Sequence, residues 1–276
     1  MESEEIMMLP AAVDKTMKQL VHSLNTRTSN IVSIYLYGSV ALQDYIEGSS
    51  DIDFIAFVRE PLTKSDIQAI AEAHEELEAQ IPNTGLMGTY LLLDDLANIR
   101  NEINAQLTYF DKQTNTQGKG ADLNPITWWI LKNQGIRFYG SEITFNYELD
   151  VASLCQYVIH NLNSYWVGWI TRLEDTLQLV LAQEQDINIE KLDQAIEWCT
   201  LGMLRQLYTL KEHDITSKIG AGFYSTHHVP GKWHGLIEEA IAIKRLQPNR
   251  LYQSQTERLT DLIDLLKFIH VEANRV

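Results

Sequence analysis

The apolar positions in the first half of the chain follow helical spacing and strand spacing in turn. Apolar side chains recur every three or four residues over 13–24, which predicts an amphipathic helix. Residues 31–37 are rich in β-branched and aromatic side chains, and residues 51–58 are almost continuously apolar, so both segments predict strands, the second one buried. A predicted helix over 64–79 separates these strands from a third strand over 90–93.

Residues 100–122 carry a less regular pattern. They are polar and contain two glycines, which is compatible with a loop or with an irregular hairpin. The adjacent Tyr109 and Phe110 either stack on a sugar or cyclitol ring or pack beneath this segment. After it, Asn124 opens a predicted helix, and residues 136–139 predict a short strand.

From Asp150 onward the spacing is helical throughout. Long helices are predicted over 154–177 and 192–210, a short one capped by Thr216 or Ser217, and further helices over 233–244 and 253–271. The change of pattern between residues 141 and 150 predicts two domains. We expect an α+β domain over 1–145 and an all-α helical bundle over 146–276.

The composition fits a two-domain protein of 276 residues. Apolar residues make up 45% of the chain, and no apolar run approaches the roughly 18 residues that a membrane-spanning helix needs. The acidic segment from Met1 to Glu5 is unlike a secretory signal, and Cys155 and Cys199 have no metal-binding or redox spacing. We therefore expect a reduced, cytoplasmic protein without a membrane partner.

The net charge of −15 limits the class of partner. Proteins that bind a nucleic acid polymer usually carry a basic stripe, and this sequence has none, so we expect no nucleic acid partner. A negative field favours the approach of a small cationic molecule. Because many proteins are acidic for solubility alone, the charge supports such a partner without selecting it.

Two aspartates stand at the start of the second predicted strand. Asp51 and Asp53 flank a single residue and therefore point to the same face of the strand. Two carboxylates about 4–5 Å apart repel each other by on the order of a few kcal/mol, so such a pair is stable when a divalent cation lies between them or one acid stays protonated. The nearby turn at Gly38 and Ser39 offers N–H groups and a hydroxyl to a phosphate. The pattern predicts a metal and phosphate site; an exposed edge strand beside an ordinary turn is the alternative.

The pair Gly38 and Ser39, an eleven-residue spacer, and the Asp-x-Asp motif of Asp51 and Asp53 together resemble the signature of the DNA-polymerase-β-like nucleotidyltransferases. This resemblance implies that the α+β domain contains a mixed sheet. It also implies that Asp51 and Asp53 are catalytic and bind Mg²⁺, and that Gly38, Ser39 and Ser50 hold the triphosphate of ATP.

The helical half extends the likeness to the aminoglycoside adenylyltransferases, especially the streptomycin/spectinomycin branch. Within 198–224, Arg205 and Lys218 match the arginine and lysine with which the family's helical domain reaches the ATP phosphates, and segments 124–129 and 136–140 also resemble the family. The resemblance implies transfer of AMP from Mg-ATP to a hydroxyl group of an aminoglycoside or aminocyclitol, and hence antibiotic resistance. Without the family, Arg205 would be expected to pair with an acid of its own bundle, and Lys218 to be solvated.

The sequence departs from the family at a third carboxylate. The family has a glutamate that acts as base on the acceptor hydroxyl, on the strand after the Pro-rich turn, whereas residues 86–91 contain no acid. Asp94 and Asp95 come about four residues too late on this strand. Glu197 and Asp193, on a predicted helix of the second domain, are alternative candidates for the base.

The missing base leaves three functions open. The first is adenylyl transfer to a small cationic antibiotic. The second is the same chemistry on another acceptor, such as a protein, and the third is a nucleotide-binding sensor without catalytic activity. A hydrolase with His227, His228 and His234 as metal ligands is a weaker alternative, because adjacent histidines in an irregular loop rarely converge on one ion.

Overall fold

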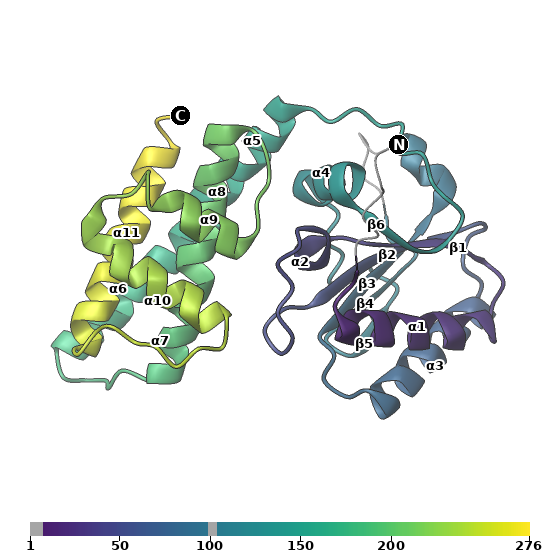
Figure 1. Cartoon of the computed structure of the whole chain (residues 1–276), viewed down its shortest axis with the longest axis horizontal. Helices are drawn as coiled ribbons and strands as arrows, with labels where there is room; N and C mark the ends of the chain where they lie inside the picture. The colour runs from purple at the N-terminus through teal and green to yellow at the C-terminus, as the bar shows by residue number, and fades with distance from the viewer. Residues whose placement is uncertain (1–7, 99–103) are drawn as a thin grey trace. The chain divides into compact units, whose positions relative to one another are not determined.

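The computed structural model describes residues 8–98 and 104–276. The chain forms two compact units, one ending at Leu149 and one running from Asp150 to Val276 (Figure 1). The first unit combines a mixed sheet with helices and the second is helical, which confirms the predicted fold class. The division of the chain into domains over 1–145 and 146–276 stays a prediction.

Six strands in the described part of the chain form the sheet of the first unit. Their order is β5-β4-β3-β2-β1-β6, with β2 and β3 parallel and the other neighbours antiparallel. The strands are β1 (Ile31–Leu36), β2 (Ile52–Val58), β3 (Leu86–Leu92), β4 (Leu107–Phe110), β5 (Gln113–Asn115) and β6 (Ile136–Gly140). This order puts β1, which ends just before Gly38, beside β2, which contains Asp53 near its start.

Helices cover both faces of this sheet. They are α1 (Ala11–Asn25), α2 (Gly38–Ala41), α3 (Lys64–Gln80), the 3₁₀ helix η1 (Leu93–Asn98) and α4 (Pro125–Gln134). α1 and α3 lie along one face and α4 along the other (Figure 1). Strand alternation sends Ile52, Phe54 and Ala56 into the core under α1 and α3, and therefore directs Asp53 to the face on which α4 lies.

The core beneath α3 holds a histidine among aromatic rings. His74 is buried, its Nε2 lies 2.9 Å from the Tyr90 hydroxyl oxygen, and its ring stacks on that of Tyr109 with 3.8 Å between centroids. Burial lowers the pKa of His74 to about 3, so this side chain is neutral at pH 7. Tyr109 therefore packs in the core, which decides between the two roles that the sequence left open for it.

The segment with the irregular pattern contains a hairpin. β4 and β5 pair antiparallel, with Tyr109 opposite Thr114, across a turn in which Asp111 and Lys112 have positive φ angles. The hairpin alternative is thus confirmed for this stretch, whereas residues 99–103 lie outside the described residues.

The second unit is built from α-helices, two of which continue through π-helical turns. Its elements are α5 (Val151–Asn161), the π turn η2 (Leu162–Trp166), α6 (Val167–Leu181), α7 (Ile189–Ala195), the π turn η3 (Ile196–Thr200), α8 (Leu201–Glu212), α9 (Lys218–Ser225), the 3₁₀ turn η4 (Gly231–Trp233), α10 (His234–Lys244) and α11 (Gln255–Ala273). Ser217 caps α9, since its side chain accepts a hydrogen bond from Gly220 N. No helix in the described ranges is long and apolar enough to cross a membrane.

The two π turns interrupt the long helices that the apolar spacing predicts over 154–177 and 192–210. They touch each other, because Trp198 Nε1 donates a hydrogen bond of 2.9 Å to the Tyr165 hydroxyl. Gly202 leaves room for the Trp166 ring, since a Cβ at this glycine would lie 2.2 Å from a carbon of that ring. The pattern of the sequence predicted the helices correctly but not their interruptions.

Candidate active site

Gly38 brings the backbone directly against a candidate carboxylate. It follows β1 with φ at +61°, a left-handed conformation that glycine adopts without strain. A Cβ at this position would lie 2.1 Å from Asp53 Oδ2. The adjacent Tyr37 N donates a 3.1 Å hydrogen bond to the Asp53 carbonyl oxygen, which holds the turn beside the strand. The two motifs predicted to act together therefore lie in contact.

Asp51 has a similar relation to a second glycine. Gly85 has φ at +60°, and a Cβ there would lie 2.8 Å from Asp51 Oδ1. The Gly85 carbonyl oxygen accepts a 3.0 Å hydrogen bond from Ile52 N, at the point where the parallel pairing of β2 and β3 begins. Both aspartates thus have a backbone turn beside a carboxylate oxygen.

The two candidate serines hold loops in this structure. Ser39 Oγ donates a 3.3 Å hydrogen bond to the Asp51 carbonyl oxygen, which joins the turn after β1 to the start of β2. Ser50 is buried, and its Oγ accepts a 3.1 Å hydrogen bond from Ile46 N. Ser39 and Ser50 therefore lie beside Asp51, and their part in phosphate binding stays a prediction.

Tyr37 and Asp122 belong to the same region, and sequence reasoning missed both. Burial raises the pKa of Tyr37, and the charges of Asp53 and then Asp122 raise it further. Both carboxylates therefore lie close enough to act on the Tyr37 hydroxyl. Asp122 comes from the segment just before α4, far from the motif in sequence, so no spacing rule could have linked it to Asp53.

The third carboxylate of the family has no counterpart on β3. Across the parallel pairing of β2 and β3, the residue beside Asp53 is Met87. Asp94 and Asp95 lie in η1, beyond the opposite end of β3. The register thus agrees with the absence that the sequence predicted.

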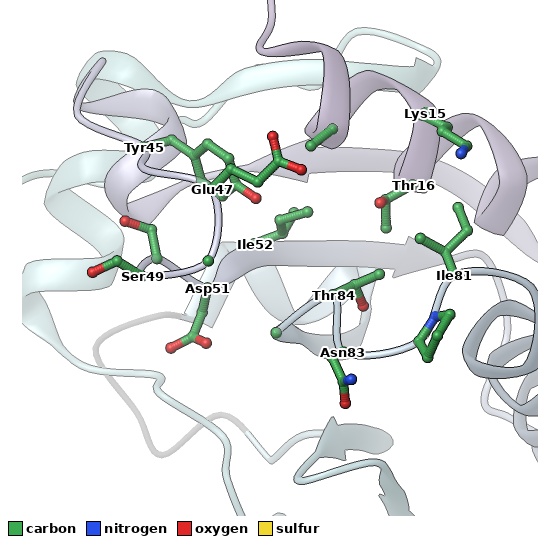
Figure 2. A pocket seen from close by; sticks show the side chains of 15 residues that line it. Lys15, Thr16, Tyr45, Glu47, Ser49, Asp51, Ile52, Ile81, Asn83 and Thr84 are labelled. Carbon is green, nitrogen blue, oxygen red and sulfur yellow. The ribbon is translucent and has the colours of Figure 1, made fainter. Parts of the chain in front are cut away.

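A cavity of about 320 Å³ adjoins Asp51. It lies between α1, the loop before β2 and the turn before β3 (Figure 2). Its lining combines the acids Glu47 and Asp51 with Lys15 and the Tyr45 ring. The cavity offers space for part of a polar molecule next to Asp51.

The helical unit brings its two predicted phosphate-binding residues together. Lys218 Nζ lies 2.8 Å from Glu197 Oε1 and 4.5 Å from the centroid of the Trp198 ring. Burial lowers the pKa of Lys218, and the positive charges of Arg205 and Lys244 lower it further. The negative charge of Glu197 and its hydrogen bond raise this pKa but do not cancel the effect of burial. Arg205 is therefore close enough to act on Lys218, and Lys218 is not the solvated lysine of the alternative interpretation.

Three other candidates for the base or for metal ligands have structural partners, namely Asp193, His228 and His234. Asp193 lies 2.6 Å from nitrogen atoms of both Arg250 and Arg258. Burial alone would raise the pKa of Asp193, but the hydrogen bonds from these arginines outweigh it and lower the pKa, which makes this carboxylate a weak base. Rings of His228 and His234 lie within hydrogen-bond distance of backbone carbonyl oxygens, at 3.0 Å and 2.9 Å.

The aspartate pair fits Mg²⁺. Asp51 is exposed and Asp53 is half-buried. The space beside the Asp53 carboxylate is open only because Gly38 has no Cβ, since a Cβ there would fill it. Carboxylate oxygens are the ligands that Mg²⁺ takes from proteins, usually one or two of them, with water and phosphate oxygens in the other positions. Across residues 8–98 and 104–276, no three His, Cys, Asp or Glu side chains are grouped to hold one metal ion. A metal at this pair would therefore share its coordination with a substrate and water.

Comparison with known families agrees with this site. Residues 17–104, which include both aspartates, match the model of the nucleotidyltransferase domain, and residues 175–267 match that of the aminoglycoside adenylyltransferase C-terminal domain. The first match defines the protein as a nucleotidyltransferase, which confirms that it belongs to a class of enzymes. The second match, in the helical unit, is to the C-terminal domain of the aminoglycoside adenylyltransferases, so the two matches together confirm the resemblance to this family.

A solved structure shares the fold. The crystal structure of spectinomycin adenyltransferase AAD(9) from Enterococcus faecialis with ATP and spectinomycin matches this chain with a TM-score of 0.63 and 13% sequence identity. The match covers 94% of this chain and 98% of that chain. No curated protein matches the sequence significantly.

Proposed function

We propose that this protein transfers AMP from Mg-ATP to a hydroxyl group of a cationic aminoglycoside or aminocyclitol antibiotic. The observation that carries the proposal is the Asp51 and Asp53 pair, with the turns at Gly85 and Gly38 against its oxygen atoms, in a domain of the nucleotidyltransferase family. Phosphoryl transfer needs positioning and charge neutralisation more than covalent chemistry, and such a pair serves both needs.

Asp51 and Asp53 would hold the metal. When bound, Mg²⁺ neutralises charge on the phosphates and on the departing pyrophosphate. The backbone at Gly38 and the hydroxyl groups of Ser39 and Ser50 would orient the triphosphate. The acceptor oxygen then attacks the α-phosphorus in line with the bond to the leaving pyrophosphate.

Arg205 and Lys218 would bind phosphate oxygens. Support for this assignment comes from the family match of the helical unit and from the effect of the Arg205 charge on Lys218. Lys218 is held by Glu197, so it would have to exchange this carboxylate for a phosphate oxygen. A partly buried lysine that is already oriented loses less side-chain freedom in such an exchange than a solvated one.

The acceptor is proposed from charge and from the solved relative. The net charge of −15 favours a cationic molecule over a nucleic acid polymer. The AAD(9) structure contains spectinomycin and ATP, which supports an aminocyclitol acceptor and ATP as the nucleotide.

One observation favours a second candidate function. Met87 lies beside Asp53, where a carboxylate could complete the site. A nucleotide-binding protein that lacks the usual base would also have no carboxylate at this position of β3. Such a protein would act on a different acceptor, for example a protein, or would serve as a sensor without transfer.

The test is mass spectrometry of the purified protein incubated with Mg-ATP and a mixed pool of aminoglycosides. We expect one antibiotic to gain the mass of AMP. Asp53→Asn should abolish this product and leave the fold intact, because it removes a metal-binding charge. Asp94→Asn, an exposed acid outside the site, is the matched control and should retain activity. Near-normal turnover of the Asp53 variant would refute the metal assignment, and ATP binding without any product would favour the sensor.

A further inference from the structure

The segment that leads into α4 crosses the sheet face on which Asp53 lies. Thr108 alternates with the core residues Leu107 and Tyr109, so its side chain is on this face, and its Oγ1 donates a 2.6 Å hydrogen bond to the Lys119 carbonyl oxygen. Gly120 packs against Phe110 on the same face, since a Cβ there would lie 2.4 Å from Phe110 Cβ. The segment is thereby held against β4 as it runs toward Asp122.

The backbone of Asp122 is fixed at the start of α4. Its carbonyl oxygen accepts a 2.5 Å hydrogen bond from Thr127 Oγ1, and its carboxylate accepts one from the Asn124 side chain. Asn124 in turn caps α4, because its Oδ1 accepts from Ile126 N and Thr127 N. These bonds keep the exposed carboxylate of Asp122 at one end of the helix that packs against α2.

α2 begins at Gly38, which contacts Asp53, so Asp122 and the aspartate pair lie in one region of the first unit. The electrostatic effect of both Asp53 and Asp122 on Tyr37 supports this placement. Asp51, Asp53 and Asp122 are all described by the structure, and they do not form a group of three ligands for one ion. Asp122 therefore lies in the same region as the aspartate pair and is not grouped with it as a third metal ligand.

We infer that Asp122 supplies the carboxylate that β3 lacks and accepts the proton of the acceptor hydroxyl; this inference rests on the proposed function. As the acceptor oxygen forms its bond to the α-phosphorus of the nucleoside triphosphate, the hydroxyl proton moves to an Asp122 oxygen. The bond from the α-phosphorus to the bridging oxygen breaks, and its electron pair leaves with pyrophosphate. Because Asp122 is exposed, it returns the proton to solvent.

The test compares Asp122→Asn and Asp122→Glu with Asp94→Asn and the unchanged protein. The asparagine can still hydrogen-bond Asn124, but it cannot take up a proton. We expect its kcat to fall about 100-fold or more, as is typical for loss of a general base, with the KM for ATP changed less than about threefold. Asp122→Glu should retain at least about ten times the kcat of Asp122→Asn, and Asp94→Asn should behave as the unchanged protein.

Thermal melting and binding of a non-hydrolysable ATP analogue show whether each variant is folded. Raising Mg²⁺ should not restore the kcat of Asp122→Asn, because Asp122 is not a ligand. The inference is overturned if that variant keeps kcat within about threefold of the unchanged protein, if it is rescued by Mg²⁺, or if asparagine and glutamate behave alike.

Asp53→Asn separates this failure from failure of the proposed function. If Asp53→Asn is inactive while Asp122→Asn is active, Asp122 is not the base and adenylyl transfer still stands. If the unchanged protein transfers AMP to no acceptor, the proposed function and the inference fall together.

Discussion

At the scale of single residues, the site depends on a glycine whose missing side chain leaves room for a carboxylate. Gly38 combines a positive φ with a close approach to Asp53, whereas Gly118 has φ at +73° and no heavy atom within 4 Å of where its Cβ would be. The two positions share the backbone conformation and differ in the contact. They therefore allow the effect of the contact to be measured alone.

We predict that Gly38→Ala lowers kcat about 100-fold, because moving a reacting group by about 1 Å has an effect of this size. Gly118→Ala should keep normal turnover and lose only the roughly 1–2 kcal/mol that a left-handed conformation costs alanine. Steady-state kinetics and chemical denaturation of both variants measure the two effects. Equal turnover of the two variants would show that the contact with Asp53 has no role.

The aspartates and the residues beside them differ in how far the sequence could predict them. Asp51 and Asp53 could be found because the pattern of a strand sets the direction of each side chain. Asp122 could not, because it reaches this region through the fold of the segment after β5, which has no regular spacing. Residues that a regular element positions are predictable, and residues that a loop positions need the structure.

At the scale of elements, the apolar spacing predicted the strands β1 and β2 and the helices α1 and α3 within a residue or two of their observed ends. It did not predict the π turns η2 and η3. A π turn holds one residue more than an α-helical turn, and the apolar residues on either side of it stay on one face of the helix, so their spacing does not reveal the extra residue. The contact between Gly202 and Trp166 could not be predicted either, since it joins two helices whose packing the sequence does not give.

We predict that Gly202→Ala destabilises the helical unit by about 1–3 kcal/mol, as expected for an overpacked core. Gly168→Ala is the matched control, because it also replaces a helical glycine and its Cβ would have no heavy atom within 4 Å. It should stabilise by about 0.5–1 kcal/mol, the difference in helix propensity. Urea denaturation followed by circular dichroism measures both, and a stable Gly202 variant would contradict the tight packing at Trp166.

At the scale of the whole molecule, stability depends on pH through a neutral histidine in the core. His74 has a pKa of about 3 in the folded chain and an ordinary value of 6.5 when unfolded. Between these values the unfolded chain binds one proton more than the folded chain. The free energy of unfolding therefore falls as the pH decreases from 6.5, by about 1.4 kcal/mol per pH unit from this group.

We predict that His74→Gln, which keeps a hydrogen-bonding group for Tyr90, lowers stability at pH 7 but flattens this slope. Denaturation at several pH values between 7 and 5 measures it, with exposed His227→Gln as the control that should leave the slope as in the unchanged protein. An unchanged slope in His74→Gln would mean that the buried histidine does not limit stability in acid.

The π turn at Ile196–Thr200 has a consequence for insertions and deletions. One residue corresponds to about 100° of rotation around a helix axis. If the helix became regular there with every residue kept, Arg205 would turn by about this angle to another side of α8. Loss of a single residue from the turn would instead make the helix regular and leave Arg205 on its present side. The direction of Arg205 thus depends on the π turn and its extra residue being present together or absent together.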